Sequence, residues 1–249
     1  IAALGIVLIL GSVTNGSKIS YSIGGITFQP SEFIKIIFVF FLASALYESH
    51  DFLRVLITAV LAGIHVLILV ASRDLGSALI FFVVYVMMVF IATGKWIYLI
   101  LGSAGGCGAA VLAYHFFTHI QVRVQAWQDP FSCIDNAGYQ ISQSLFAISS
   151  GGWFGLGLFR GTPTSIPYVE ADFVFSAVAE ELGILFSMCV ILICISCFIM
   201  FMNIAMRLKN KFYQLIAFGL GVTYIFQVFL TIGGGTKFIP MTGVTLPLI

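Results

Sequence analysis

Charge is the scarcest property of this chain. Asp, Glu, Lys and Arg make up 8% of its 249 residues, whereas ordinary soluble domains carry about 25%. Hydrophobic residues make up 60% of the sequence, more than the interior of a soluble fold of this length accommodates. The composition therefore excludes an ordinary soluble domain and indicates a membrane protein.

The chain also lacks the features of disulfide-rich or nucleic-acid-binding proteins. Cys133 stands alone in a loop and the remaining cysteines fall in apolar runs, so we expect buried free thiols and not a disulfide or metal framework. The net charge of +1 favours neither nucleic acid nor a strongly acidic partner. Because Ile1 stands inside an apolar run without an initiator Met, we expect the sequence to be a fragment.

The apolar residues gather in runs close to the roughly 20 residues with which a helix crosses a bilayer, and not in the alternating segments of about ten residues typical of barrels. We therefore predict an all-α, polytopic membrane helix bundle that forms a single transmembrane domain over residues 1–249. Seven spans are expected, at residues 1–13 (incomplete), 28–47, 52–71, 75–93, 96–117, 172–206 and 212–232.

The connection at residues 118–171 is far longer than the others. Loops beyond about 15 residues are usually functional, and this one contains apolar turns and several glycines, so we expect short helices within it. Lys and Arg in the short loops set the orientation. The loops at 48–51, 94–95 and 207–211 and the residues beside them hold more of these cations than the opposite loops, so we place them in the cytoplasm and 118–171 outside.

Several charges lie one or two turns inside the predicted spans at the outer end, where an unpaired charge costs several kcal/mol. Glu32 and Lys35 are three residues apart on one helical face, just after Pro30. They form either an internal ion pair, or a site where Lys35 holds an anionic group such as a diphosphate and Glu32 orients it. Arg73 and Asp74 stand at a tight turn, where Asp74 is equally explained as a helix cap.

Asp172 opens the sixth predicted span, with Ser176 and Glu180 four and eight residues later on the same helical face. An N-cap is the simplest role for Asp172. The alternative is a column of polar groups that leads from the outer surface into the bundle. Gly102 and Gly106 indicate close helix packing.

Successive motifs resemble those of the FtsW/RodA-like family of shape, elongation, division and sporulation (SEDS) proteins. They occur in family order along nearly the whole chain: Gln29-Pro30-Ser31-Glu32 with Lys35, Arg73-Asp74-Leu75-Gly76, Arg123 with Trp127, Gly138-Tyr139-Gln140, the glycines from 151 to 161, Asp172-Phe173-Val174-Phe175, Glu180-Glu181-Leu182-Gly183 and Pro240-Met241-Thr242-Gly243. The family has ten transmembrane helices, so the resemblance implies that this chain lacks the N-terminal helices and most of the last one.

The resemblance implies a peptidoglycan glycosyltransferase that polymerises lipid II at the outer face of the bacterial cytoplasmic membrane. The family's catalytic aspartate falls on Asp172, which we expect to act as general base. The family's cavity residues fall on Glu32 and Lys35. Substrate-binding cations are expected among Lys35, Arg73, Arg123 and Arg160, with Asp74, Ser176 and Glu180 in supporting positions.

The same resemblance implies a class B penicillin-binding transpeptidase as partner. No organic cofactor is expected, although Mg²⁺ or Mn²⁺ is compatible with a departing diphosphate. Two other functions stay open from the residues. A lipid II flippase would need polar residues through the whole membrane depth, and a non-catalytic scaffold of the division or elongation machinery would leave Asp172, Glu32 and Lys35 replaceable.

Overall fold

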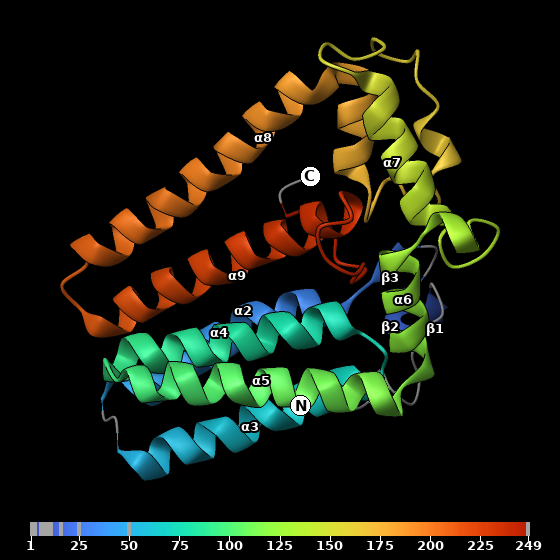
Figure 1. Cartoon of the computed structure of the whole chain (residues 1–249). Helices are drawn as coiled ribbons and strands as arrows, with labels where there is room; N and C mark the ends of the chain where they lie inside the picture. Colours follow the sequence, from blue (N-terminus) through green and yellow to red (C-terminus); the bar gives the residue numbers. More distant parts are fainter. Residues whose placement is uncertain (1–3, 5–11, 15–16, 24–25, 49–50, 248–249) are drawn as a thin grey trace. The chain divides into compact units, whose positions relative to one another are not determined.

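The computed structural model describes residues 4, 12–14, 17–23, 26–48 and 51–247. Helices dominate this part of the chain (Figure 1). They are α2 Pro30–Tyr47, α3 Phe52–Ala71, α4 Leu75–Thr93, α5 Trp96–Phe116, α6 Thr118–Gln128, α7 Tyr139–Gly151, α8 Val174–Arg207 and α9 Lys211–Gly235, with 3₁₀ turns at Phe131–Cys133 and Pro163–Ser165.

Six of these helices are long and apolar enough to cross a membrane, namely α2, α3, α4, α5, α8 and α9. The predicted helical membrane bundle is therefore confirmed. The expected span at residues 1–13 lies almost entirely outside the described residues. Helix α9 continues to Gly235, three residues beyond the predicted end at 232. The three glycines 233–235 are therefore helical and do not end the helix.

A small antiparallel sheet precedes α2, in the region predicted as a loop. Strand β2 (Ser17–Ile23) pairs with β1 (Ser12–Thr14) and with β3 (Ile26–Phe28). Apolar and polar residues alternate strictly from Lys18 to Ile23, which is the period of a strand. That alternation was the signal from which β2 was predictable.

The helix boundaries follow from local chemistry. Pro30 occupies the first turn of α2, where its fixed φ suits a helix and its missing N–H is not needed. Asp74 caps α4, because its Oδ1 accepts the backbone N–H of Ser77 at 3.1 Å. The cap role that the sequence left open for Asp74 is thus confirmed. Gly94 ends α4 in the left-handed conformation that glycine adopts without strain.

The chain forms two compact units, and each is described by itself. The single domain predicted over residues 1–249 stays a prediction. The first unit comprises residues 1–106 and 198–223. Its core lies among α2, α3 and α4, where Phe38, Leu42, Leu46, Phe81 and Met88 are almost fully buried.

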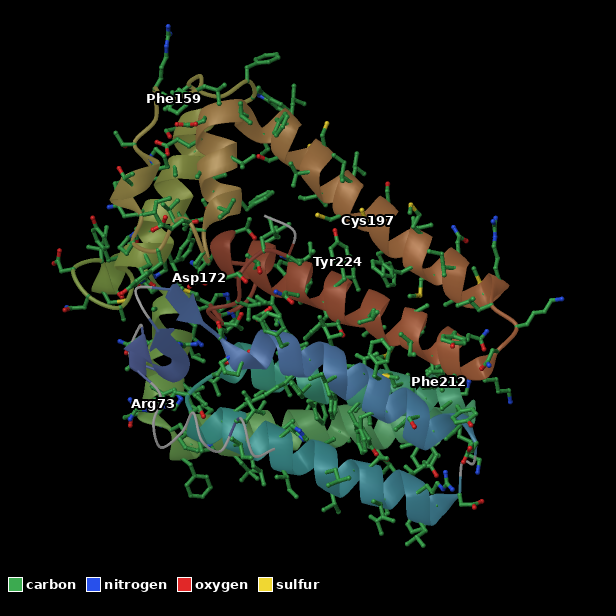
Figure 2. All side chains as sticks on the ribbon, turned by 180° about the vertical axis from the view of Figure 1, so that it is seen from behind. Arg73, Phe159, Asp172, Cys197, Phe212 and Tyr224 are labelled. Carbon is green, nitrogen blue, oxygen red and sulfur yellow. The ribbon has the colours of Figure 1, made fainter. Side chains whose placement is uncertain are left out.

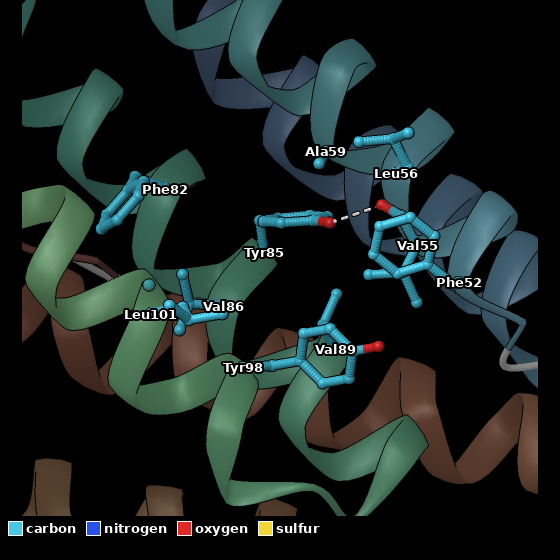
Figure 3. A pocket seen from close by; sticks show the side chains of 11 residues that line it. Phe52, Val55, Leu56, Ala59, Phe82, Tyr85, Val86, Val89, Tyr98 and Leu101 are labelled. Atoms are coloured by element: carbon cyan, nitrogen blue, oxygen red, sulfur yellow. Dashed lines mark hydrogen bonds between the residues drawn. The ribbon is translucent and has the colours of Figure 1, made fainter.

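Helix α5 packs closely on α4 in this unit. A Cβ on Gly102 would meet Val86 at 2.7 Å and one on Gly106 would meet Phe82 at 2.7 Å, so the close packing predicted for both glycines is confirmed. An apolar cavity of about 290 Å³ lies between α3, α4 and α5 (Figure 3). The Tyr85 hydroxyl there donates to the Val55 carbonyl at 2.9 Å, and none of the predicted site residues lines this cavity.

The second unit comprises residues 107–197 and 224–249. It contains the whole of the long connection at 118–171, whose predicted short helices are α6 and α7. Phe173, Ile166 and Ala147 form its buried cluster, against which Val169 and Met241 pack. This cluster supports the turn that leads from residue 166 into α8.

Helix α8 is broken at Gly183, whose φ of 83° and ψ of 172° are not helical. The carbonyls freed by the break accept hydrogen bonds from residues 152–161, the glycine loop that follows α7. The Glu180 carbonyl accepts the Leu156 N–H and the Glu181 carbonyl accepts the Gly157 N–H, both at 2.9 Å. The freed N–H groups of Ile184 and Leu185 donate to the carbonyls of Gly152 and Trp153. The loop thus satisfies the backbone groups that a broken helix would otherwise leave unpaired in an apolar region.

Candidate functional site

Asp172 lies at the turn before α8 (Figure 2). Helix α8 begins at Val174, so Asp172 stands two residues before the first helical residue and not at the N-cap that the sequence suggested. Its carboxylate lines a small hollow with the end of α9 and residues 241–244. Gly243 has a φ of +74°, and a Cβ there would lie 3.9 Å from Asp172 Oδ2. The carboxylate therefore faces a backbone stretch without an intervening side chain.

The stretch beside Asp172 is held in place by side chains from α6 and α9. Arg123 donates to the carbonyls of Met241 and Thr242 at 3.4 Å, and Trp127 donates to the carbonyl of Lys237 at 3.1 Å. From α9, Gln227 donates to the Thr245 carbonyl at 3.0 Å and Thr231 to the Val244 carbonyl at 2.8 Å. Arg123, predicted to bind substrate, therefore also positions the segment next to Asp172.

Thr242 lies in this hollow and did not emerge from the sequence as a site residue. Its Oγ1 is buried and has no hydrogen-bond partner within the described ranges of the chain. A buried hydroxyl without a partner costs about 1–3 kcal/mol. The motif at residues 240–243 was the only sequence signal for it, since no spacing connects Thr242 to Asp172.

Ser176, predicted in a supporting position, is fully buried in a polar chain that joins three helices. Its hydroxyl lies 2.6 Å from that of Ser144 on α7, and Ser144 donates to the Gly235 carbonyl on α9 at 2.7 Å. Ser176 therefore fixes the position of the first turn of α8, close after Asp172. The buried hydrogen bond to Ser144 is thus a sufficient reason for a serine at position 176, and no contact with a substrate is needed to explain it.

Glu180 lies one turn further along α8 in a second hollow. Its Oε1 accepts the Thr162 N–H at 3.0 Å, and its side chain is 5% exposed. Arg160 lines the same hollow from the glycine loop. Asp172 and Glu180 thus belong to different hollows of the second unit.

Lys35 and Glu32 form an ion pair in the first unit. Lys35 Nζ lies 2.8 Å from both carboxylate oxygens of Glu32, and the Lys35 side chain is 4% exposed against 38% for Glu32. The ion-pair interpretation is therefore confirmed. The pair leaves the Glu32 carboxylate at the accessible end and the lysine below it, which is compatible with either role suggested by the sequence.

Asp74 connects the start of α2 with the turn between α3 and α4. Its Oδ2 accepts from the Gln29 side chain at 3.3 Å, and Gln29 also donates to the Ser31 hydroxyl at 3.0 Å. Burial raises the pKa of the Asp74 carboxyl, although the hydrogen bonds from Ser77 oppose the shift. Glu32 raises the same pKa further and Lys35 lowers it, so the charges of this cluster act on one another.

Arg73 precedes Asp74 with a φ of 63°, in the left-handed region that a non-glycine residue seldom adopts (Figure 2). The turn thereby connects α3 to α4 with a single sharp reversal. Three predicted residues, Glu32, Lys35 and Asp74, thus act on one another in the first unit, and the exposed Arg73 stands next to Asp74 in the chain. Arg123, Arg160, Asp172, Ser176 and Glu180 belong to the second unit.

No group of three or more His, Cys, Asp and Glu side chains gathers within the residues that the structure describes. Mg²⁺ is typically held by one or two carboxylates together with substrate phosphates. The Mg²⁺ or Mn²⁺ expected from the sequence stays a prediction.

These features define a multi-span membrane protein with carboxylates and cations gathered at helix ends. The chain belongs to the FtsW, RodA and SpoVE family, described as cell cycle proteins, which it matches over residues 1–249. The family membership suggested by the motifs is thereby confirmed.

Curated relatives include the peptidoglycan glycosyltransferase RodA of Mycobacterium tuberculosis, 33% identical over 95% of this chain and 54% of that protein. The probable peptidoglycan glycosyltransferase FtsW of Aliivibrio salmonicida is 32% identical over 99% of this chain and 64% of the relative. Stage V sporulation protein E of Bacillus subtilis is 30% identical over 96% and 68%. The chain spans about half to two thirds of the length of these relatives.

Two solved structures share the fold. A chain of a peptidoglycan synthase complex, studied for the coordination of polymerization and crosslinking, matches with a TM-score of 0.81 and 25% identity over 99% of this chain and 71% of that one. The rod shape determining protein RodA of Thermus thermophilus matches with a TM-score of 0.66 and 24% identity over 99% and 67%.

Proposed function

We propose that this chain is the membrane core of a peptidoglycan glycosyltransferase, which polymerises lipid II at the outer face of the bacterial cytoplasmic membrane. Asp172 carries the proposal. It occupies the position of the family's catalytic aspartate, and its carboxylate lines a hollow bounded by the family motif at residues 240–243. The names of the relatives, which include peptidoglycan glycosyltransferases, support the same activity.

Asp172 acts as general base in this mechanism. It takes the proton from an acceptor sugar hydroxyl as the oxygen attacks the anomeric carbon of the donor. The new glycosidic bond forms while the bond from that carbon to the diphosphate breaks, and the diphosphate leaves with the electron pair. Such a base must reach within about 3 Å of the proton. A single displacement of this kind inverts the configuration at the anomeric carbon.

The departing diphosphate gains negative charge, which cations or a metal ion must stabilise. Lys35 and Arg73 are the candidates in the first unit, and Arg123 and Arg160 are the candidates in the second. Lys35 is the most constrained of them, because both oxygens of Glu32 hold its ammonium group. Mg²⁺ or Mn²⁺ bound through the diphosphate would supply further positive charge.

We also propose a class B penicillin-binding transpeptidase as partner, because a strand polymerised outside the membrane needs crosslinking. The relationship to a chain of a peptidoglycan synthase complex supports this assignment. Recognition between the two proteins would use the exposed apolar faces of the spans, such as those of α5, on which no residue is buried.

The decisive test uses the full-length protein, purified with its transpeptidase and supplied with lipid II. Gel separation of the glycan product is expected to show strands longer than the disaccharide. Transport of lipid II across vesicles without any polymer would instead indicate a flippase. Neither polymer nor transport, from a protein that still binds its transpeptidase, would indicate a scaffold.

A further inference from the structure

A polar cavity of about 280 Å³ lies in the second unit, apart from the hollow of Asp172. The glycine loop, α7 and the first part of α8 line it. Its lining combines hydrogen-bonding side chains with a few apolar ones: Gln143, Phe146, Ala147, Ser150, Leu156, Arg160, Gly161, Thr162, Ser165 and Glu180. This volume is near the small end of the range for ligand pockets, roughly 300–1,000 Å³.

Glu180 presents an unused acceptor in this cavity. Its side chain is 5% exposed, and Oε1 accepts the Thr162 N–H, whereas Oε2 is buried and has no hydrogen-bond partner in the described part of the chain. Folded proteins rarely leave a buried carboxylate oxygen without a donor. A Cβ at Gly161 would approach the Glu180 carboxyl carbon to 2.9 Å, so the loop closes over the carboxylate because residue 161 is glycine.

Arg160 supplies the complementary group. It lines the cavity but is itself exposed, and within the described residues it forms no ion pair with Glu180. A carboxylate only accepts hydrogen bonds from a ligand hydroxyl or N–H, whereas a guanidinium only donates. A ligand that carries donors at one end and acceptors at the other satisfies both groups together.

We propose that this cavity binds one N-acetylated hexosamine ring of the glycan. A sugar hydroxyl donates to Glu180 Oε2, the acetamido carbonyl accepts from Arg160, and the apolar face of the ring lies on Phe146, which is 47% exposed. The neutral groups Gln143, Thr162 and Ser165 match further hydroxyls. The small volume limits the site to one ring of a strand. This assignment deepens the proposed function and rests on it.

Binding of tetra-N-acetylchitotetraose, a soluble N-acetylhexosamine chain, to the full-length protein in nanodiscs tests the proposal. Saturation-transfer NMR is expected to detect acetyl-group contacts in the unmodified protein. Glu180→Gln and Arg160→Ala should each raise the Kd at least tenfold. Because the probe has no diphosphate, a loss with Arg160→Ala reports on this cavity alone.

Glu181→Gln is the matched control. This neighbouring carboxylate accepts the Phe159 N–H and does not line the cavity, so its variant should bind like the unmodified protein. Arg160→Ala changes an exposed loop residue and keeps the test decisive if Glu180→Gln does not fold. Monodisperse elution of each variant in size-exclusion chromatography establishes that it is folded.

Three results would overturn the sugar site: no saturable binding by the unmodified protein, equal losses in Glu180→Gln and Glu181→Gln, or tighter binding of the de-N-acetylated amine form. The last result would mean that Glu180 receives an ammonium group. Since binding is measured without turnover, a protein that polymerises lipid II but fails these tests disproves only the sugar site. A protein that binds the sugar but makes no polymer disproves only the proposed activity.

Discussion

Asp172 is separated from the other carboxylates of the second unit by its surroundings. Glu180 is enclosed by a loop, and Glu181 accepts a backbone N–H from Phe159, whereas Asp172 borders a hollow beside backbone that carries no side chain at Gly243. The motif resemblance places the family's catalytic aspartate at Asp172 and at neither glutamate. This makes Asp172 the residue on which the proposed chemistry depends most.

The first prediction concerns Asp172→Asn, which preserves size and hydrogen-bonding capacity but cannot accept a proton as a carboxylate does. Glycan synthesis from lipid II is expected to fall by roughly 10²-fold or more, the usual share of a positioned general base. Glu170→Gln is the control, because this exposed carboxylate stands two residues earlier in the chain. Polymerisation by Asp172→Asn within a few-fold of the unmodified protein would make Asp172 a structural residue.

Lys35→Met is the second prediction. Methionine is cheaper than lysine in an apolar setting, so the helix should insert normally, while polymerisation falls by roughly 10-fold to 100-fold, as expected for a lost charged hydrogen bond of about 1.5–3 kcal/mol. Turnover is measured at matched protein levels. Normal turnover would remove Lys35 from the substrate site, and loss of folded protein without a change in specific activity would leave only the ion pair with Glu32.

At the scale of single residues, the sequence offered local interpretations that were right at two places and wrong at a third. The ion pair of Glu32 with Lys35 and the cap formed by Asp74 were each one of two interpretations left open, whereas the N-cap suggested for Asp172 is wrong because α8 begins at Val174. The hydrogen bonds from Arg123 to residues 241 and 242 join positions more than 100 residues apart in the chain, and no local pattern encodes them. The hollow beside Asp172 was unpredictable for the same reason.

Among the elements, α8 departs most from what the sequence suggested. An apolar run without Pro predicted one continuous span, yet the chain breaks at Gly183 because the glycine loop supplies the missing hydrogen bonds. The break needs both Gly183 and the glycine loop, which are more than 20 residues apart in the chain. The break holds the segment with Ser176 and Glu180 against α7 and the loop, which is how Glu180 comes to line the polar cavity.

The third prediction tests whether the glycine loop stabilises the break at Gly183, by comparing two glycines of that loop. Gly152 and Gly155 both have positive φ, so alanine at either position costs about 1–3 kcal/mol of backbone strain. Only at Gly155 does a Cβ collide with backbone, that of Glu181 and Gly183. Gly155→Ala should therefore destabilise the protein by roughly 1–3 kcal/mol more than Gly152→Ala, the usual cost of overpacking.

Thermal unfolding of both variants in the same detergent measures that difference. Gly108→Ala serves as the reference for a glycine-to-alanine change, since a Cβ there meets nothing within 4 Å and its φ is not positive. Equal Tm values for Gly152→Ala and Gly155→Ala would mean that the loop does not pack closely against the backbone at Gly183. The carbonyls at residues 180 and 181 would then need another source of hydrogen bonds.

For the whole molecule, composition alone identified the membrane class, and the length of the apolar runs identified six spans with bounds within a few residues. Orientation in the membrane is a different property, because it depends on the distribution of Lys and Arg between loops and not on packing. The short sheet before α2 was not predicted, because the signal of a strand is an alternation over a few residues and not an apolar run of about 20.

The last prediction is that residues 118–171 face outward and residues 207–211 face the cytoplasm. In a chain whose native cysteines are replaced by alanine, Ser132→Cys should react with a membrane-impermeant maleimide in intact cells, because Ser132 is exposed in the structure. Lys209→Cys, equally exposed, should react only after the membrane is opened. The opposite pattern in folded protein would reverse the orientation. Asp172 follows directly on residues 118–171, so its carboxylate would then lie on the cytoplasmic side, where strands destined for the wall are not assembled, and the proposed site would fail.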